Sequence, residues 1–105
     1  TDLYNVQFLP WAQNDLLEIV QKIANDLFNK QAANKLADEI IKATDTLADF
    51  PYAYPVYNPI RPINTEYRKL IVQNYMVFYS VDEKTKTVTV ARIVYAKRDY
   101  DKLVK

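Results

Sequence analysis

Hydrophobic and polar residues alternate along residues 3–9, and the spacing then becomes helical. The alternation predicts a short strand with one apolar face. That face consists of Tyr4, Val6 and Phe8. Pro10 follows, and proline is favoured in the first turn of a helix because the N–H that it lacks would have no partner there. Apolar residues then recur every three or four positions, which predicts a helix over residues 11–28.

A second helical pattern starts near Gln31. Its apolar stripe consists of Ala33, Leu36, Ala37, Ile40, Ile41, Thr44, Leu47 and Ala48. The pattern ends before Pro51, because the residue that precedes a proline avoids the helical region. Only a few residues separate the two helices, so we predict that they form an antiparallel hairpin.

Residues 51–62 hold four prolines and three tyrosines, which favours an extended loop over a helix or a central strand. Two interpretations are open for these tyrosines. They are either exposed for the recognition of a partner, or packed against the core as the loop wraps over it. Because tyrosine is commonly half buried, the packed arrangement is favoured.

The C-terminal part predicts three consecutive strands, rich in β-branched and aromatic residues. Their expected ranges are residues 67–72, 75–81 and 87–95. A tight turn at Gln73-Asn74 and a charged loop would connect them into an antiparallel meander, and residues 99–104 are expected to add a helical turn. The predicted order is β-α-α-β-β-β. This is a single α+β domain over residues 1–105, an antiparallel sheet with the N-terminal helical hairpin packed on one face.

Arg92 interrupts the apolar pattern of the last predicted strand. A period of two gives that strand one face that contains Val88, Val90, Arg92 and Val94. A charged side chain on such a face is costly unless it pairs with a carboxylate or reaches the edge of the sheet. We therefore favour an ion pair for Arg92 over a functional role.

The chain contains no Gly, no Cys and no His. Without Cys it has no disulfide and no thiolate site, and without His it lacks the usual general base near neutral pH and the commonest metal ligand. The absence of Gly argues against a glycine-rich loop that holds phosphate. We expect no metal and no cofactor, so that any chemistry would use Arg, Lys, Tyr, Asp or Glu.

Charge is divided unevenly between the two halves of the chain. Residues 1–60 carry 4 Lys against 8 Asp and Glu, a net charge of −4, and residues 61–105 carry 10 Lys and Arg against 5 Asp and Glu, a net charge of +5. The split is compatible with a basic binding surface and equally with ordinary solvated helices and strands. No apolar run approaches the roughly 20 residues of a membrane helix, and no signal-peptide pattern is present. A cytoplasmic protein without a membrane partner is expected.

Three motifs follow one another in the C-terminal half. They are Tyr67-Arg68-Lys69-Leu70, then Tyr75-Met76-Val77-Phe78-Tyr79, then a segment from Val88 to Asp99 with Arg92-Ile93 inside it and Lys97-Arg98-Asp99 at its end. These motifs resemble the RelE/ParE toxin family. In that family a basic strand leads into a strand that contains a hydrophobic residue followed by Val-Phe-Tyr, and a Val-x-Val-x-Arg-Ile strand then ends in a basic motif. The N-terminal strand followed by Ala12, Asp15-Leu16 and Ile19 agrees with this resemblance, which covers nearly the whole chain.

The resemblance implies the toxin of a type II toxin–antitoxin system. In that family an antitoxin silences the toxin by folding its C-terminal segment onto it, so a toxin–antitoxin hetero-oligomer is expected. RelE-like members cut mRNA in the ribosomal A site without a metal, whereas ParE-like members poison DNA gyrase. A plain interaction module without toxicity is the third possibility.

The nuclease positions of the family are only partly retained. If the chain is a nuclease, the resemblance assigns catalytic roles to Arg68, Arg98 and Tyr95. Met76, however, stands where the nucleases carry Arg, and Leu70 replaces another basic position. A methionine cannot stabilise the charge of a phosphate. The ParE-like branch is therefore favoured, with gyrase rather than the ribosome and mRNA as target. The residues expected to bind a target or partner are Arg68, Lys69, Arg92, Lys97, Arg98 and Lys102.

Overall fold

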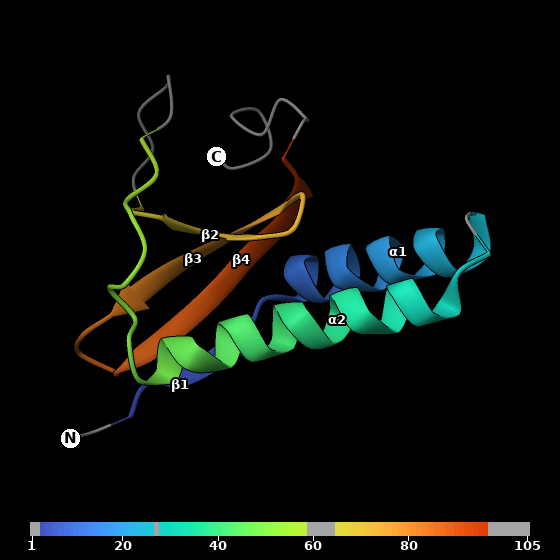
Figure 1. The fold of residues 1–105 in the computed structure, drawn as a ribbon. Coiled ribbons are helices and arrows are strands. Elements are labelled where there is room, and N and C mark those ends of the chain that lie inside the picture. Colours follow the sequence, from blue (N-terminus) through green and yellow to red (C-terminus); the bar gives the residue numbers. More distant parts are fainter. Residues whose placement is uncertain (1–2, 27, 59–64, 97–105) are drawn as a thin grey trace.

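The chain folds into two layers, a four-stranded sheet and a helical hairpin that packs on one face of it (Figure 1). The computed structural model describes residues 3–26, 28–58 and 65–96. The elements are β1 (Asn5–Phe8), α1 (Pro10–Asp26), α2 (Lys30–Asp45), the 3-10 turn η1 (Thr46–Ala48), β2 (Arg68–Val72), β3 (Tyr75–Asp82) and β4 (Thr87–Tyr95). The predicted order of elements and the α+β class are confirmed.

The sheet has the strand order β1-β4-β3-β2. Strands β2, β3 and β4 form the predicted antiparallel meander. Strand β1 instead pairs in parallel with the first half of β4, from Asn5 opposite Thr87 to Phe8 opposite Val90. Parallel neighbours need a long connection, and here the hairpin and two strands intervene between the pair. The sheet is thus mixed, with β1 at one edge.

Both helices start where the sequence predicts. Helix α1 begins at Pro10, and the side chain of Asn29 caps α2 by accepting a hydrogen bond from the backbone N–H of Ala32 at 2.9 Å. Helix α2 ends at Asp45, earlier than expected, and the chain continues as η1. Within the described ranges, neither helix is long and apolar enough to cross a membrane.

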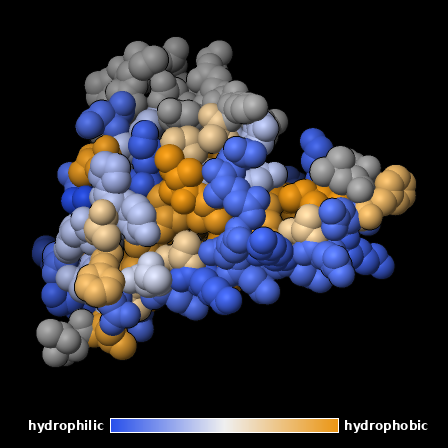
Figure 2. All heavy atoms as spheres, in the orientation of Figure 1, coloured by the Kyte–Doolittle hydropathy of each residue, from blue (hydrophilic) through white to orange (hydrophobic). Residues whose placement is uncertain are grey.

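The main core lies between the helical hairpin and the sheet, on what we call the hairpin face. Its buried residues are Ala12, Leu36, Ile40, Leu47, Leu70, Val72, Val77, Tyr79, Val88, Val90 and Ile93. Small residues, Ala12 on α1 and Ala33 on α2, are almost fully buried and let the helices approach their neighbours closely. Figure 2 shows hydrophilic residues over the outward side of α2 and hydrophobic ones between the helices and the sheet.

A β-bulge interrupts the pairing of β3 with β4. Tyr79 lies opposite Val90, whereas the preceding residue, Phe78, lies opposite Arg92. Ala91 is therefore the extra residue on β4. An extra residue in one strand reverses the alternation of faces beyond it.

The bulge makes the predicted face of β4 wrong beyond Val90. The predicted face contained Val88, Val90, Arg92 and Val94, but Ile93 joins the core under the hairpin instead. Val94 packs with Phe78 on the opposite side, which we call the far face. A strict period of two in the sequence does not predict an inserted residue.

The proline-rich segment passes the start of β2, where Val56 forms a bridge with Arg68 (Figure 1). The backbone N–H of Tyr57 donates to the carbonyl of Tyr67 at 2.8 Å, and that of Lys69 donates to the carbonyl of Pro55 at 3.1 Å. These bonds give the edge of β2 partners that it would otherwise lack. They also carry Tyr57 onto the far face.

A second, smaller core lies on the far face. Tyr57, Met76, Phe78 and Val94 are buried together there, and the Tyr57 and Phe78 rings meet edge to face with centroids 4.9 Å apart. The packed interpretation is thus confirmed for Tyr57. Tyr52 behaves differently, because it stays 47% exposed.

Among the residues that the structure describes, three adopt a left-handed backbone although none is glycine. They are Phe28 (φ 50°), Gln73 (φ 52°) and Lys86 (φ 53°), and each follows or precedes a helix or strand. The predicted turn at Gln73-Asn74 is confirmed, but Gln73 rather than Asn74 takes the positive φ. For residues with a Cβ this conformation is strained by roughly 1–2 kcal/mol.

We predict that Phe28→Gly raises the free energy of unfolding by about 0.5–1 kcal/mol, because glycine removes the strain and its greater freedom in the unfolded chain offsets only part of the gain. The Phe28 side chain is 90% exposed, so little packing is lost. Urea denaturation measures the change. Gln31→Gly, on the exposed side of α2, is the control and should lower stability. An unchanged or lower stability for Phe28→Gly would contradict the prediction.

Candidate functional site

Arg68 is held in place by the proline-rich segment. Its Nη1 donates to the carbonyl oxygen of Tyr54 at 2.7 Å, and its guanidinium lies 4.9 Å from the centroid of the Tyr52 ring. The Glu66 carboxylate is 3.8 Å from Nη2. The side chain of Arg68 is only 18% exposed. Arg68 is therefore largely engaged in anchoring the loop to β2.

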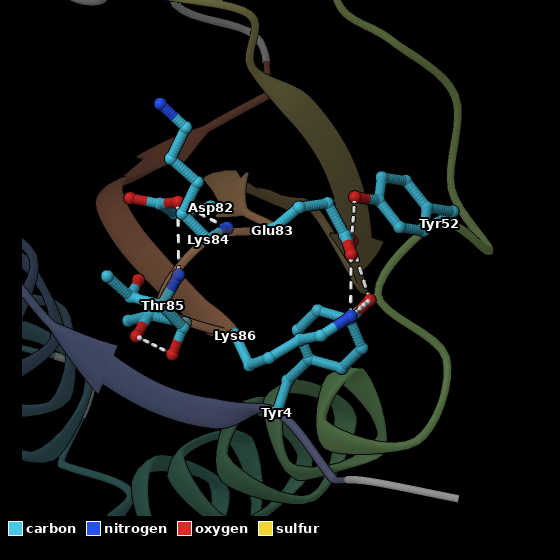
Figure 3. Close-up of polar contacts among 8 residues, drawn as sticks. Tyr4, Tyr52, Asp82, Glu83, Lys84, Thr85 and Lys86 are labelled. Atoms are coloured by element: carbon cyan, nitrogen blue, oxygen red, sulfur yellow. Dashed lines mark hydrogen bonds and ion pairs between the residues drawn. The ribbon is translucent and has the colours of Figure 1, made fainter.

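A polar network around Glu83 joins three distant parts of the chain (Figure 3). The Glu83 carboxylate, in the β3–β4 loop, accepts a hydrogen bond from the hydroxyl of Tyr4 at 2.5 Å and another from the hydroxyl of Tyr52. The Lys86 ammonium lies 2.8 Å from the other Glu83 oxygen. We call these four residues the Glu83 network. Nothing local in the sequence indicated it, since its members come from the residue before β1, the proline-rich segment and the β3–β4 loop.

The network shifts the pKa of its members. Hydrogen bonds from Lys86, Tyr4 and Tyr52 hold the pKa of Glu83 at about 2, well below its usual value. The hydrogen bond to Glu83 raises the pKa of Tyr52 to about 12 and also raises the pKa of Tyr4. Each shift favours the state found at neutral pH, a carboxylate that accepts from neutral tyrosines.

Arg92 forms the expected ion pair, and its partner is Asp15 of α1. The Arg92 Nε lies 2.7 Å from one carboxylate oxygen and Nη2 lies 3.1 Å from the other. The backbone N–H of Ile93 donates to the same carboxylate at 3.0 Å. The hydrogen bond that Arg92 donates to Asp15 raises the pKa of Arg92. Because the pairing with β1 stops at Val90, Asp15 takes the place of a neighbouring strand at this edge of β4.

The two described nuclease candidates are far apart. Arg68 lies opposite Tyr79, while Tyr95 lies opposite Tyr75, four residues away along β3. At the rise of a strand this is about 13 Å. Tyr95 packs edge to face on Tyr75, with ring centroids 5.5 Å apart. Burial, and then the neighbouring Tyr95, raise the pKa of Tyr75.

The remaining basic candidates fall into two groups. Lys69 and Arg92 both lie opposite Phe78, so the sheet brings them into one row on the far face. The side chain of Arg92 nevertheless turns to Asp15. The other members of the predicted binding set, Lys97, Arg98 and Lys102, lie outside the described residues.

Two grooves border α1. The first, which we call the hairpin groove, has a volume of about 590 Å³ and runs between the two helices. It is lined by Phe8, Gln13, Leu16, Leu17, Val20, Ala37 and Ile41. The second, which we call the sheet-edge groove, has a similar volume of about 590 Å³ and lies between α1 and the end of β4. Its lining includes Glu18, Ile19, Lys22, Ile23, Tyr75 and Tyr95. Sequence periodicity alone did not separate these partly exposed apolar residues from the buried ones.

Comparison with known families identifies the chain. The family described as "ParE toxin of type II toxin-antitoxin system, parDE" matches residues 6–100. The chain belongs to the ParE toxin family. It is accordingly the toxin of a type II toxin–antitoxin system. No curated protein sequence matches this toxin.

Solved structures share the fold of the toxin at low sequence identity. The chromosomal ParDE system from P. aeruginosa has a TM-score of 0.72 at 15% identity, covering 92% of this chain and 100% of that one. The RelBE2 complex from Mycobacterium tuberculosis has a TM-score of 0.61 at 18% identity, covering 89% and 98%. The archaeal RelE–RelB complex from Pyrococcus horikoshii OT3 has a TM-score of 0.61 at 16% identity, covering 91% and 98%. The toxin therefore has the fold shared by ParE and RelE proteins.

The Met76 side chain of the toxin is buried rather than exposed. It is 5% exposed and packs with Tyr57, Phe78 and Val94 in the second core. The backbone bridge between the proline-rich segment and β2 keeps Tyr57 in place there. The position that the resemblance linked to a catalytic Arg is thus an apolar position beneath a loop.

We predict that Asp15→Ala lowers the free energy of unfolding by about 2 kcal/mol, because Arg92 loses its carboxylate and the Ile93 N–H loses its acceptor. Asp15→Asn keeps an acceptor and should cost less. Asn14→Ala, at the neighbouring exposed position, is the control and should stay within about 0.5 kcal/mol of wild type. Urea denaturation measures all three. A loss for Asp15→Ala no larger than that of the control would refute the role given to this carboxylate.

We predict that Glu83→Gln removes an acid-dependent part of the stability. The pKa of Glu83 is lowered in the folded toxin to about 2, so its contribution is complete above pH 4.5 and is lost as the pH falls through about 2. Thermal unfolding midpoints measured between pH 2 and 7 should fall less steeply in the variant. The ultraviolet titration of Tyr52 should also move from about 12 towards 10. Glu66→Gln is the control, and equal pH profiles for Glu83→Gln and wild type would contradict the prediction.

Proposed function

We propose that this toxin arrests growth by poisoning DNA gyrase, and that a cognate antitoxin neutralises it by folding onto it. The choice of gyrase as the target rests on the buried Met76. In RelE-like nucleases the resemblance puts an Arg at this position. Phosphoryl transfer needs cationic groups in contact with the phosphate. A thioether covered by Tyr57 and Phe78 supplies none.

The positions of Arg68 and Tyr95 support the same choice. Metal-independent cleavage of RNA needs a group that activates the 2′-hydroxyl close to a cation that stabilises the phosphate. Arg68 and Tyr95 are separated by about 13 Å along β3. Arg68 is also engaged with Tyr54 and Tyr52. A nuclease site would have to be assembled around the segment that contains Arg98.

The two grooves support an antitoxin partner. Leu17 is 54% exposed and Ile41 is 42% exposed, and both line the hairpin groove. Exposed apolar grooves of this kind accept the apolar face of an amphipathic segment. The solved relatives include ParDE and RelBE systems, which supports the same kind of partner for this chain. We expect the antitoxin segment to cross the helical hairpin and the sheet-edge groove.

The decisive experiment is induced expression in bacteria without antitoxin, with parallel readouts of mRNA integrity and chromosome breakage. The proposal expects growth arrest with intact mRNA and a DNA-damage response. Purified toxin should also increase DNA cleavage by purified gyrase. The Asn14→Ala variant, which changes one exposed side chain of α1, is the matched control for expression level.

The alternatives predict different results. Rapid cleavage of mRNA at codon-related positions with intact DNA, abolished by Arg98→Ala in a folded protein, would make the toxin a ribosome-dependent nuclease. Normal growth at full expression would indicate an interaction module without toxicity. Either result would overturn the gyrase proposal.

A further inference from the structure

The far face of the sheet is accessible on its β1 side. Alternate residues of β1 and β4 pack against the core under the hairpin, so the residues between them point to the far face. The Gln7 and Thr89 side chains confirm this orientation, because Gln7 Nε2 donates to Thr89 Oγ1 at 3.1 Å. Gln7 is exposed and Thr89 is half-buried. The proline-rich segment, by contrast, is bonded to β2, on the other side of the sheet.

An uncharged surface extends from this part of the far face to the start of α1. Trp11 and Leu9 are its exposed apolar residues, at 70% and 37%, and the other members carry amides and hydroxyls. The Leu9 N–H donates to the carbonyl of Val90 at 2.9 Å, which places the start of α1 directly beside β4. We call this surface the neutral patch, and it consists of Asn5, Gln7, Leu9, Trp11, Thr87 and Thr89.

The charged groups at the border of the neutral patch are engaged within the toxin. Arg92 is paired with Asp15 at 2.7 Å. The Asp82 carboxylate accepts from the backbone N–H groups of Lys84 at 2.9 Å and Thr85 at 3.3 Å. Recognition of nucleic acid needs Lys or Arg side chains that face the phosphates, and the patch itself supplies none. A protein surface therefore fits the neutral patch better than DNA does.

Trp11 is the residue of the patch best suited to anchor a partner. A pocket of about 190 Å³ lies between its indole and the ion pair of Asp15 and Arg92. Exposed on the first turn of α1, the indole offers a large and rigid apolar surface. Protein interfaces are depleted of charge at their centres, and tryptophan is among the residues that contribute most to binding there.

We propose that the toxin binds gyrase through the neutral patch, with Trp11 as the anchor, and that it contacts the protein surface of gyrase rather than the DNA. This inference rests on the proposed gyrase target and names the part of the toxin that meets it. The complementary surface would be uncharged, with an apolar recess for the indole. The patch spans two strands and the start of a helix, a broad area that fits a folded protein, whereas each groove beside α1 fits a single segment.

Trp11 can report on its own surroundings, because it is the single Trp of the chain. Toxin that contains fluorotryptophan therefore gives one fluorine NMR signal. We expect purified gyrase bound to duplex DNA to shift or broaden this signal, because the exposed indole becomes buried. The same duplex DNA without gyrase should leave the signal unchanged.

Removal of the indole should weaken binding to gyrase. We expect Trp11→Ala to lower the affinity of the toxin for immobilised gyrase by at least about tenfold, with an equal loss in gyrase-dependent DNA cleavage. Phe28→Ala is the matched control, since Phe28 is 90% exposed and follows the other end of α1, and its affinity should match wild type. Urea denaturation checks that both variants are folded.

Charges placed on the patch distinguish a protein surface from DNA. Gln7→Lys and Gln7→Glu should each weaken binding to gyrase by about threefold, because either charge loses water in an uncharged interface. Gln21→Lys and Gln21→Glu, at an exposed position of α1 outside the patch, are the controls and should bind as wild type does. Contact with DNA would instead make Gln7→Lys bind more tightly and Gln7→Glu less tightly.

Several outcomes would overturn the neutral patch as the gyrase-binding surface. A fluorine signal that gyrase leaves unchanged would do so, as would Trp11→Ala with wild-type affinity or a signal that DNA alone shifts. A toxin dimer that Trp11→Ala disperses would make a second copy the occupant. A signal that shifts with purified antitoxin but not with gyrase would make the antitoxin the occupant.

DNA cleavage by gyrase, measured with the wild-type toxin, separates this inference from the proposed function. A wild-type toxin that increases cleavage, together with a Trp11→Ala variant that does so equally well, overturns the neutral patch alone. A wild-type toxin without effect on gyrase overturns the proposed target, and the neutral patch as its binding surface falls with it.

Discussion

The position of the helical hairpin depends on one carboxylate. β1 pairs with β4 only as far as Val90, and beyond this point the edge of β4 has no neighbouring strand among the described residues. Asp15 occupies this place, because it accepts hydrogen bonds from the Ile93 backbone and from two nitrogens of Arg92. A carboxylate that accepts from both a backbone N–H and a guanidinium fixes the distance of α1 from β4 and the rotation of α1 about its own axis. The hairpin groove and the sheet-edge groove both have α1 as a wall, so this contact helps to position one wall of each.

A different set of contacts holds the proline-rich segment against the sheet. The proline-rich segment is bonded to the edge of β2, and the Tyr79 hydroxyl donates to the carbonyl of Pro51 from within the core at 2.8 Å. Burial raises the pKa of Tyr79 to about 12, so this donor stays protonated. The Glu83 network holds the start of the segment from outside. Together these contacts hold the proline-rich segment, which places Tyr57 over Met76.

The distribution of covered and exposed apolar surface is typical of a protein that binds a partner. The proline-rich segment covers the second core and the start of β2, whereas the grooves beside α1 retain exposed leucine and isoleucine side chains. A domain of this size buries only about two-thirds of its unfolded surface, so a partner that covers those grooves would add substantially to its stability.

The sequence by itself determined the elements and their order. Periodicity located both helices and all four strands within a few residues, and Pro10 and Pro51 indicated where the helical region begins and ends, because these signals depend on neighbours in the chain. The resemblance of the C-terminal motifs indicated the family for the same reason. The need of Arg92 for a carboxylate also followed from its place among valines.

Which distant residues are in contact became clear only from the folded structure. Three features depend on residues that are far apart in the chain. They are the pairing of Arg92 with Asp15, the bulge at Ala91 that places Ile93 in the core, and the contacts of Glu83 with Tyr4 and Tyr52. The separation of Arg68 from Tyr95 likewise required the register of β3. Local propensities act over a few residues, whereas register, bulges and side-chain networks are settled by packing across the whole sheet.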